Sequence, residues 1–193
     1  MTGNVIFGPK AQVAAFGAHL AELGRETKTV RDMKWYICSQ ATQPLTSMQV
    51  QRANLEDLEP VAQAQAEMFQ AATSTDPRVA DPEGFVYRVF QRIERSRTWI
   101  KLESGEVVFK TELQSVTPEV VYIEGVWTRE DKRGHGIATS CFNELVHRLL
   151  KQHVMLCLAV EPEEEAALKL YEQVGFKYAE EYQARYLKPL PTK

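Results

Sequence analysis

The order of apolar and polar residues at the start of the chain predicts a short strand, a helix and a second strand. Residues 4–7 are apolar enough for a strand. The next segment repeats its apolar residues on one helical face and runs to Gly24, a residue type that commonly ends helices. Residues 34–38 again have the composition of a strand. The first forty residues therefore predict a small β-α-β unit.

A change of pattern marks the end of this unit. The stretch 39–47 is polar, contains Pro44 and shows no periodicity, which is typical of a connection. We therefore expect an N-terminal β-α-β extension and linker over residues 1–47 and a main domain over residues 48–193.

The main domain is predicted to open with a half-buried strand over residues 48–53, where apolar and polar residues alternate. Asn54 suits the N-cap of a first helix, and the loop 73–82 separates that helix from a second one. Three strands joined by short turns follow, which indicates antiparallel neighbours. They cover residues 98–103, 106–116 and 119–127.

The later part of the main domain predicts a parallel strand pair. Residues 154–160 are seven consecutive apolar residues, as expected of a strand covered on both faces. A helical crossover joins the strand that ends at Trp127 to this one, so the two should run parallel. A helix that stops at Gly175 and a closing strand region over 176–187 complete an α/β fold with a mixed sheet.

Composition narrows the class of protein. The chain of 193 residues has a net charge of −3, 44% hydrophobic residues and 25% charged residues, which is normal for a globular domain and gives no sign of a nucleic-acid or membrane surface. No run approaches the ~20 apolar residues of a membrane span. Cys38, Cys141 and Cys157 suit reduced core positions, and we expect a cytoplasmic protein without a metal site.

The turn between the third meander strand and the next helix carries the strongest chemical signal. Its sequence is Arg133-Gly134-His135-Gly136-Ile137-Ala138-Thr139. A strand that enters a helix through a glycine turn directs several unpaired backbone N–H groups at one point, and the helix dipole adds positive charge there. Glycines also let a phosphate approach the backbone closely. The turn therefore predicts an anion site.

This turn and a second motif resemble the GNAT superfamily of acyl-CoA N-acetyltransferases. The spacing Arg-x-x-Gly-x-Ala from Arg133 is similar to the family's pyrophosphate-binding motif. Downstream, Ala167-x-x-Leu170-Tyr171-x-x-x-Gly175-Phe176 matches the family's second motif. The resemblance covers about residues 48–187 and implies the GNAT fold, here with a small N-terminal β-α-β appendage, and acetyl-CoA as co-substrate.

The resemblance also implies where acetyl-CoA binds. In the family a bulge parts the first parallel strand from the second, and freed backbone groups pair with pantetheine; Gly125 suits that bulge. The diphosphate contacts map to the glycine turn. The implied cofactor-binding residues are Val126, Trp127, Thr128, Arg133, Gly134, His135, Gly136, Ile137, Ala138 and Thr139.

Two residues are implied to be catalytic. Tyr171 occupies the family's general-acid position, and Glu124 lies in the strand that often carries the carboxylate base. For Glu124, a structural pairing with Lys101 or Lys110 is an equal alternative, and Glu112 or water are other bases.

Two further features concern the coenzyme contacts of the second strand and the acceptor pocket. Where family members often have asparagines after the buried strand, this chain has Glu161 and Glu164. In the family the segment equivalent to 72–97 borders the acceptor pocket. Its arginines are expected to form a solvated helix face: Arg88, Arg92 and Arg95.

The leading hypothesis is direct transfer of acetyl from acetyl-CoA to a primary amine in a ternary complex. The acceptor, a small molecule or a protein lysine or N-terminus, stays open, as does a monomeric or homodimeric state. The alternatives are an acyl-CoA-binding sensor or non-catalytic interaction module of the same fold, and an acyltransferase for longer chains.

Overall fold

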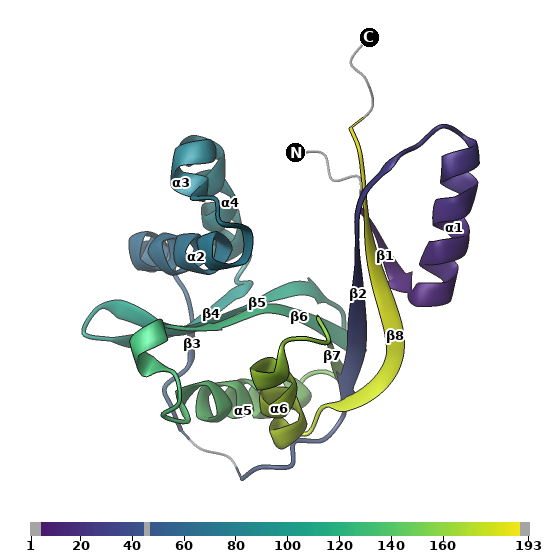
Figure 1. The fold of residues 1–193 in the computed structure, drawn as a ribbon. Helices are drawn as coiled ribbons and strands as arrows, with labels where there is room; N and C mark the ends of the chain where they lie inside the picture. The colour runs from purple at the N-terminus through teal and green to yellow at the C-terminus, as the bar shows by residue number, and fades with distance from the viewer. Residues whose placement is uncertain (1–4, 45–46, 190–193) are drawn as a thin grey trace.

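The computed structural model of the protein describes residues 5–44 and 47–189. Its strands form one mixed eight-stranded sheet (Figure 1). Along the sheet the strands lie in the order β1-β8-β2-β7-β6-β5-β4-β3. The strands are β1 Val5–Pro9, β2 Thr27–Cys38, β3 Gln51–Arg52, β4 Thr98–Glu103, β5 Glu106–Val116, β6 Val120–Thr128, β7 Met155–Val160 and β8 Lys177–Leu187.

The helices lie on both faces of the sheet (Figure 1). Their bounds are α1 Lys10–Glu22, α2 Leu58–Thr73, α3 Pro77–Ala80, α4 Pro82–Glu94, α5 Ile137–Leu150 and α6 Glu165–Val174. Helices α5 and α6 cover one face, where they share a core with β6 and β7. Helices α2 and α4 cover the opposite face near β4 and β5 and enclose a second core. None of the helices in residues 5–44 and 47–189 is long and apolar enough to cross a membrane.

Most predicted elements are confirmed. The meander β4-β5-β6 is antiparallel, and β6 and β7 run parallel on either side of the crossover helix α5. Asn54 caps the turn before α2, since its Oδ1 accepts from the Glu56 amide at 2.7 Å while Asp57 accepts from the Asn54 amide at 2.9 Å. The three cysteines are buried and unpaired.

The N-terminal β-α-β unit is confirmed, and its strands belong to the main sheet. β2 is longer than the predicted 34–38 and lies inside the sheet, paired with β7 on one side and β8 on the other. The added part, residues 27–33, is mostly polar, so it has no apolar pattern that would predict a strand. The division of the chain at residue 47 stays a prediction.

Three local predictions need correction or fall outside the described residues. The predicted strand 48–53 shortens to Gln51–Arg52. The predicted loop 73–82 contains the short helix α3, which Pro77 starts and which the Asp76 side chain caps. Asn4 of the predicted first strand, residues 45–46 of the connection and the chain ends 1–4 and 190–193 lie outside the described residues.

Gly175 ends α6 in a conformation that only glycine adopts easily, with φ +115°. A Cβ added there would lie 2.7 Å from the Gln40 carbonyl oxygen and 3.1 Å from the Thr42 amide nitrogen. The chain that leaves β2 therefore packs directly against this helix end.

We predict that Gly175→Ala lowers the free energy of unfolding by roughly 2–4 kcal/mol, because backbone strain and a steric clash add. Gly24→Ala is the matched control, since Gly24 also has positive φ but nothing lies within 4 Å of an added Cβ. It should cost about 1–2 kcal/mol from backbone strain alone. Urea unfolding of both variants measures the difference, and equal losses would contradict the clash.

Candidate active site

β6 carries one more residue than β5 at Gly125. Between two paired positions, β5 contributes Thr111 alone whereas β6 contributes Gly125 and Val126, which defines a β-bulge. Gly125 has φ +60°, and the Thr111 hydroxyl donates to the Glu124 carbonyl at 3.1 Å beside it. An added Cβ would make ordinary contact with Met68 at 3.5 Å, so the backbone conformation is what requires glycine. The bulge expected at Gly125 is confirmed.

β6 and β7 part close to this bulge. Their parallel register runs from Val120–Met155 to Tyr122–Cys157, although both strands continue beyond it. On their other edges β7 pairs with β2 along Leu156–Val160 and β6 pairs with β5 along Val121–Thr128. The facing edges of the two strands are therefore free for another partner.

A cavity of about 630 Å³ lies beside the end of β6 that has no β7 partner, on the face covered by α5 and α6. Its wall combines the end of β6, the glycine turn, the first turn of α5 and one side of α6. All the predicted cofactor-binding residues line it except His135, which is exposed at the turn. In the described part of the chain, no three His, Cys, Asp or Glu side chains are grouped as a metal site needs.

The end of the cavity at the glycine turn suits an anion. Gly134 and Gly136 have φ of +77° and +76°, and a Cβ at either would meet nothing within 4 Å. Gly136 is the N-cap of α5 and offers no side-chain cap. Within the described residues, the amides from Gly134 to Thr139 donate to no backbone acceptor. These N–H groups and the dipole of a fourteen-residue helix make the site electropositive.

The cations of the turn are already partly engaged. Arg133 Nε donates to the Thr128 carbonyl at 3.0 Å, which fixes the side chain against the end of β6 and leaves its other N–H groups available. Lys132 pairs with Glu103 at 2.9 Å. Arg133 is therefore the better placed of the two for a bound phosphate.

Tyr171 lies at the α6 side of the cavity and is 8% exposed. Its ring packs against Phe142 at 5.5 Å and Phe176 at 6.1 Å between centroids. Burial, with a smaller effect of the Glu164 carboxylate, raises the pKa of Tyr171. The hydroxyl therefore keeps its proton at neutral pH.

Of α6, the sequence assigned only Tyr171 to the site, although Ala167 and Leu170 were named in its motif and Glu164 was named after the buried strand. Alongside Tyr171 the cavity is lined by Glu164, Ala166, Ala167, Lys169, Leu170 and Gln173. Ala167 and Glu164 precede Tyr171 by four and seven residues, so helical spacing could have identified them. The other glutamate after β7, Glu161, pairs with Arg31 of β2 at 2.8 Å and does not line the cavity.

Glu124 belongs to a charged cluster on the opposite face of the sheet, under α2 and α4. Arg92 of α4 bridges the carboxylates of Glu112 and Glu124, at 3.5 Å from the latter. Lys110 is fully buried and lies 3.3 Å from Glu112. Burial raises the pKa of Glu124, while Arg92 opposes that shift. The Glu124 side chain stays 31% exposed, so it can still reach a substrate.

This cluster corrects two expectations. Arg92 was expected on a solvated helix face, but α4 lies close enough to β5 and β6 for its guanidinium to reach both carboxylates. Glu124 pairs with this arginine, whereas Lys101 donates to the Met48 carbonyl and Lys110 pairs with Glu112.

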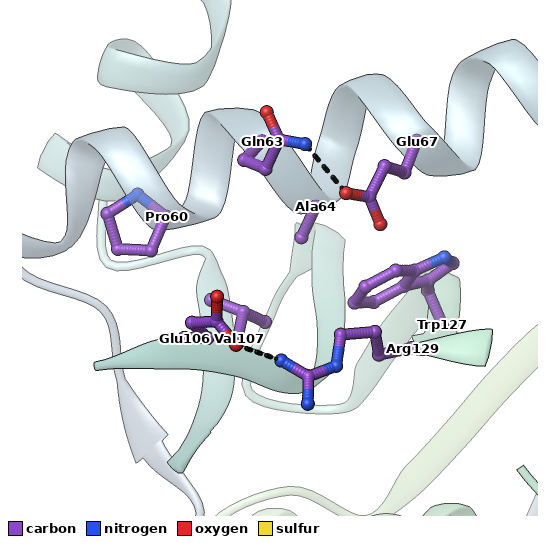
Figure 2. Close-up of a pocket in the computed structure, with 8 residues that line it drawn as sticks. All are labelled: Pro60, Gln63, Ala64, Glu67, Glu106, Val107, Trp127 and Arg129. Atoms are coloured by element: carbon purple, nitrogen blue, oxygen red, sulfur yellow. Dashed lines mark hydrogen bonds and ion pairs between the residues drawn. The ribbon is translucent and has the colours of Figure 1, made fainter. Parts of the chain in front are cut away.

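A smaller pocket of about 270 Å³ lies between α2 and the β5-β6 pair (Figure 2). Trp127 lines both this pocket and the larger cavity, and it belongs to the core under α2 and α4. The rim is closed by internal contacts: Gln63 donates to Glu67 at 2.7 Å, and Arg129 pairs with Glu106 (Figure 2).

Comparisons with known proteins agree with this geometry. The model of the acetyltransferase (GNAT) family matches residues 62–176. That span starts within α2 and includes the bulge, the glycine turn and α6. Among curated proteins, none matches the sequence of this chain significantly.

Solved structures show the same fold at low identity. An acetyltransferase from the GNAT family from Colwellia psychrerythraea is 18% identical over 95% of this chain and 64% of that one, with a TM-score of 0.67. A GCN5-related N-acetyltransferase from Sphaerobacter thermophilus is 18% identical over 95% of this chain and 58% of that one, with a TM-score of 0.56. The chain thus spans about three fifths of the length of these two proteins, N-terminal unit included.

A third solved structure is a complex with a ligand. AAC(6')-Iy in complex with the bisubstrate analogue CoA-S-monomethyl-acetylneamine is 13% identical, covering 66% of this chain and 89% of that one, with a TM-score of 0.51.

The buried pair Lys110–Glu112 gives a test of the charged cluster. We predict that Lys110→Met lowers the free energy of unfolding by about 3–5 kcal/mol, because Glu112 loses one of its two cations while it stays buried. The double variant Lys110→Met with Glu112→Leu should lose less than half as much, since no unpaired charge then remains there. Urea unfolding measures both, and a double variant as unstable as the single one would contradict the pairing.

Proposed function

The chain belongs to the acetyltransferase (GNAT) family, and we propose that it transfers acetyl from acetyl-CoA directly to a primary amine. One observation carries the proposal. The strands part after Tyr122 and Cys157, where a cavity joins an electropositive helix start to a buried tyrosine, with a carboxylate on the other face of the sheet. Such an arrangement can hold the two substrates on opposite sides of one gap.

The cavity residues fit acetyl-CoA. The free amides of 134–139 and the Arg133 guanidinium suit a diphosphate, because both are donors held in place before a ligand arrives. The β6 edge from Val126 to Thr128 lines the cavity and has no β7 partner, so its backbone groups can pair with the amides of the pantetheine arm. Acetyl-CoA supplies the acetyl group as a thioester.

Glu124 is the proposed general base. An alkylammonium with a pKa of about 10.4 is only a few parts in ten thousand neutral at pH 7, so its proton must be removed before the nitrogen attacks. Glu124 lies on the α2–α4 face, opposite the coenzyme cavity, and is partly exposed. An amine that arrives from that face would meet this carboxylate first. Arg92 would hold the carboxylate in position during the transfer.

Tyr171 is the proposed general acid. As the nitrogen–carbon bond forms and the carbon–sulfur bond breaks, negative charge passes to the sulfur. A tyrosine hydroxyl that lines the same cavity and keeps its proton can donate to that sulfur. The tetrahedral oxyanion needs a donor too, and the amides of β6 that have no β7 partner can supply it.

The proposal is tested by two measurements on the same protein. Calorimetry should detect binding of acetyl-CoA, and an amine panel should release free thiol. Tyr171→Phe should lower kcat about 10²–10³-fold while acetyl-CoA affinity changes little, because the hydroxyl acts on the leaving group. Tyr36→Phe is the control. The Tyr36 hydroxyl donates to Glu172 of α6, the helix that carries Tyr171, but Tyr36 does not line the cavity.

Three results would separate the alternatives. No heat with acetyl-CoA or CoA would remove the enzyme assignment. Binding without thiol release would favour a sensor. Loss of acetyl-CoA binding in Tyr171→Phe would contradict the acid role.

The base assignment predicts a specific pH dependence. Glu124 accepts a proton when ionised, and burial raises its pKa from 4.5, so kcat/KM should rise with pH through a value above 4.5. Glu124→Gln should remove this limb and lower kcat/KM about 10²–10³-fold. Glu119→Gln, just before β6 and exposed, should retain the wild-type profile. A limb that persists in Glu124→Gln would assign the base to another group.

A further inference from the structure

Four aromatic rings from four strands meet on the concave side of the sheet, and we name them the aromatic wall: Phe7 of β1, Trp35 of β2, Tyr122 of β6 and Tyr182 of β8. Trp35 and Tyr182 stack with centroids 4.4 Å apart and ring planes 9° apart. The ring centroid of Tyr122 lies 5.4 Å from that of Trp35 and 6.0 Å from that of Phe7. The rings therefore form one continuous surface.

The aromatic wall exists because the sheet curls. Three strands lie between β1 and β6, and at about 4.8 Å per strand a flat sheet would separate these two by roughly 19 Å. The rings of Phe7 and Tyr122 are nevertheless in contact. Figure 1 shows the cause, since β1, β2 and β8 stand at a steep angle to β4, β5 and β6. The N-terminal unit is thus bent toward the gap.

The aromatic wall begins where the proposed reaction occurs. Tyr122 is the last residue of β6 that pairs with β7, and Glu124 follows two positions later on the same face of the strand. The two side chains are close enough that Glu124, after burial, raises the pKa of Tyr122. Phe7 is 38% exposed and the other three rings are partly exposed, so the surface is accessible.

The charged groups beside the aromatic wall offer little net charge to an acceptor. Arg92 and Lys110 are matched by Glu112 and Glu124, so the cluster has no net charge when all four are ionised. Glu180 lies opposite Trp35 across β2 and β8, and its carboxylate, after burial, raises the pKa of Tyr182, so one negative charge lies beside the rings. A single ammonium that shares Glu124, attached to an apolar body that covers the rings, fits both features.

We propose that the acceptor is an arylalkylamine, a primary amine on a short carbon chain that ends in an aromatic ring. Its ring would pack on the aromatic wall, because offset and edge contacts between rings add to the burial of apolar surface. Its ammonium would lie beside Glu124, where ring faces also attract a cation. This inference rests on the proposed function, because it takes Glu124 as the point of reaction.

Acetyl transfer to two primary amines, one with an aromatic ring and one without, tests the proposal. For the wild type, kcat/KM for 2-phenylethylamine should exceed that for ethanolamine at least tenfold. Phe7→Leu and Trp35→Leu should lower the value for 2-phenylethylamine at least tenfold and leave ethanolamine within twofold. Tyr178→Leu is the control, because this exposed ring of β8 contacts Tyr36 on the opposite face.

A binding measurement keeps this test independent of catalysis. Calorimetry with 2-phenylethylammonium and no acyl donor should give a dissociation constant that rises at least tenfold in Phe7→Leu and stays unchanged in Tyr178→Leu. If no amine is acetylated, the proposed function fails, yet this binding result still decides on the wall. Equal affinity in wild type and Phe7→Leu, or an equal loss of kcat/KM for both amines, would overturn the inference.

Discussion

β6 carries an extra residue at Gly125, its later half does not pair with β7, and the proposed pantetheine contacts use that gap. Backbone groups left unpaired inside a sheet are costly, so both strands need firm support on their other edges. β6 pairs with β5 on its other edge, and β7 pairs with residues Lys34–Cys38 of β2. The N-terminal unit thus supplies the hydrogen bonds that let β7 stand apart from β6.

The gap connects two environments of different character. On the α5–α6 side, donors face an open cavity and suit a polyanionic ligand. On the α2–α4 side, Lys110 and Glu112 are buried as a pair, and Arg92 joins them to Glu124. Buried ion pairs add little net stability, but they fix side chains in one arrangement. Here that arrangement holds a carboxylate at the edge of the gap without neutralising it by direct contact with lysine.

The sequence could predict the features that local rules govern. Glycines mark the turn at Gly134 and Gly136, and apolar periodicity marks α5 and α6, because each depends on neighbours in the chain. The bulge at Gly125 was expected from the resemblance to the family. The position of β2 between β7 and β8 depends on pairing across more than a hundred residues, which no local pattern encodes. Arg92 was missed for the same reason, since its partners lie on strands that follow α4.

The same contrast separates the two sides of the site. The donor side comes largely from one segment, β6 to α6, which the family model matches and which carries the two motifs. The amine side combines α4 and β6 with rings from β1, β2 and β8, so it draws on both ends of the chain. Residues before 62 lie outside the family match. A domain can therefore keep its acyl donor while changes in the N-terminal unit, through rings such as Phe7 and Trp35, alter which amine it accepts.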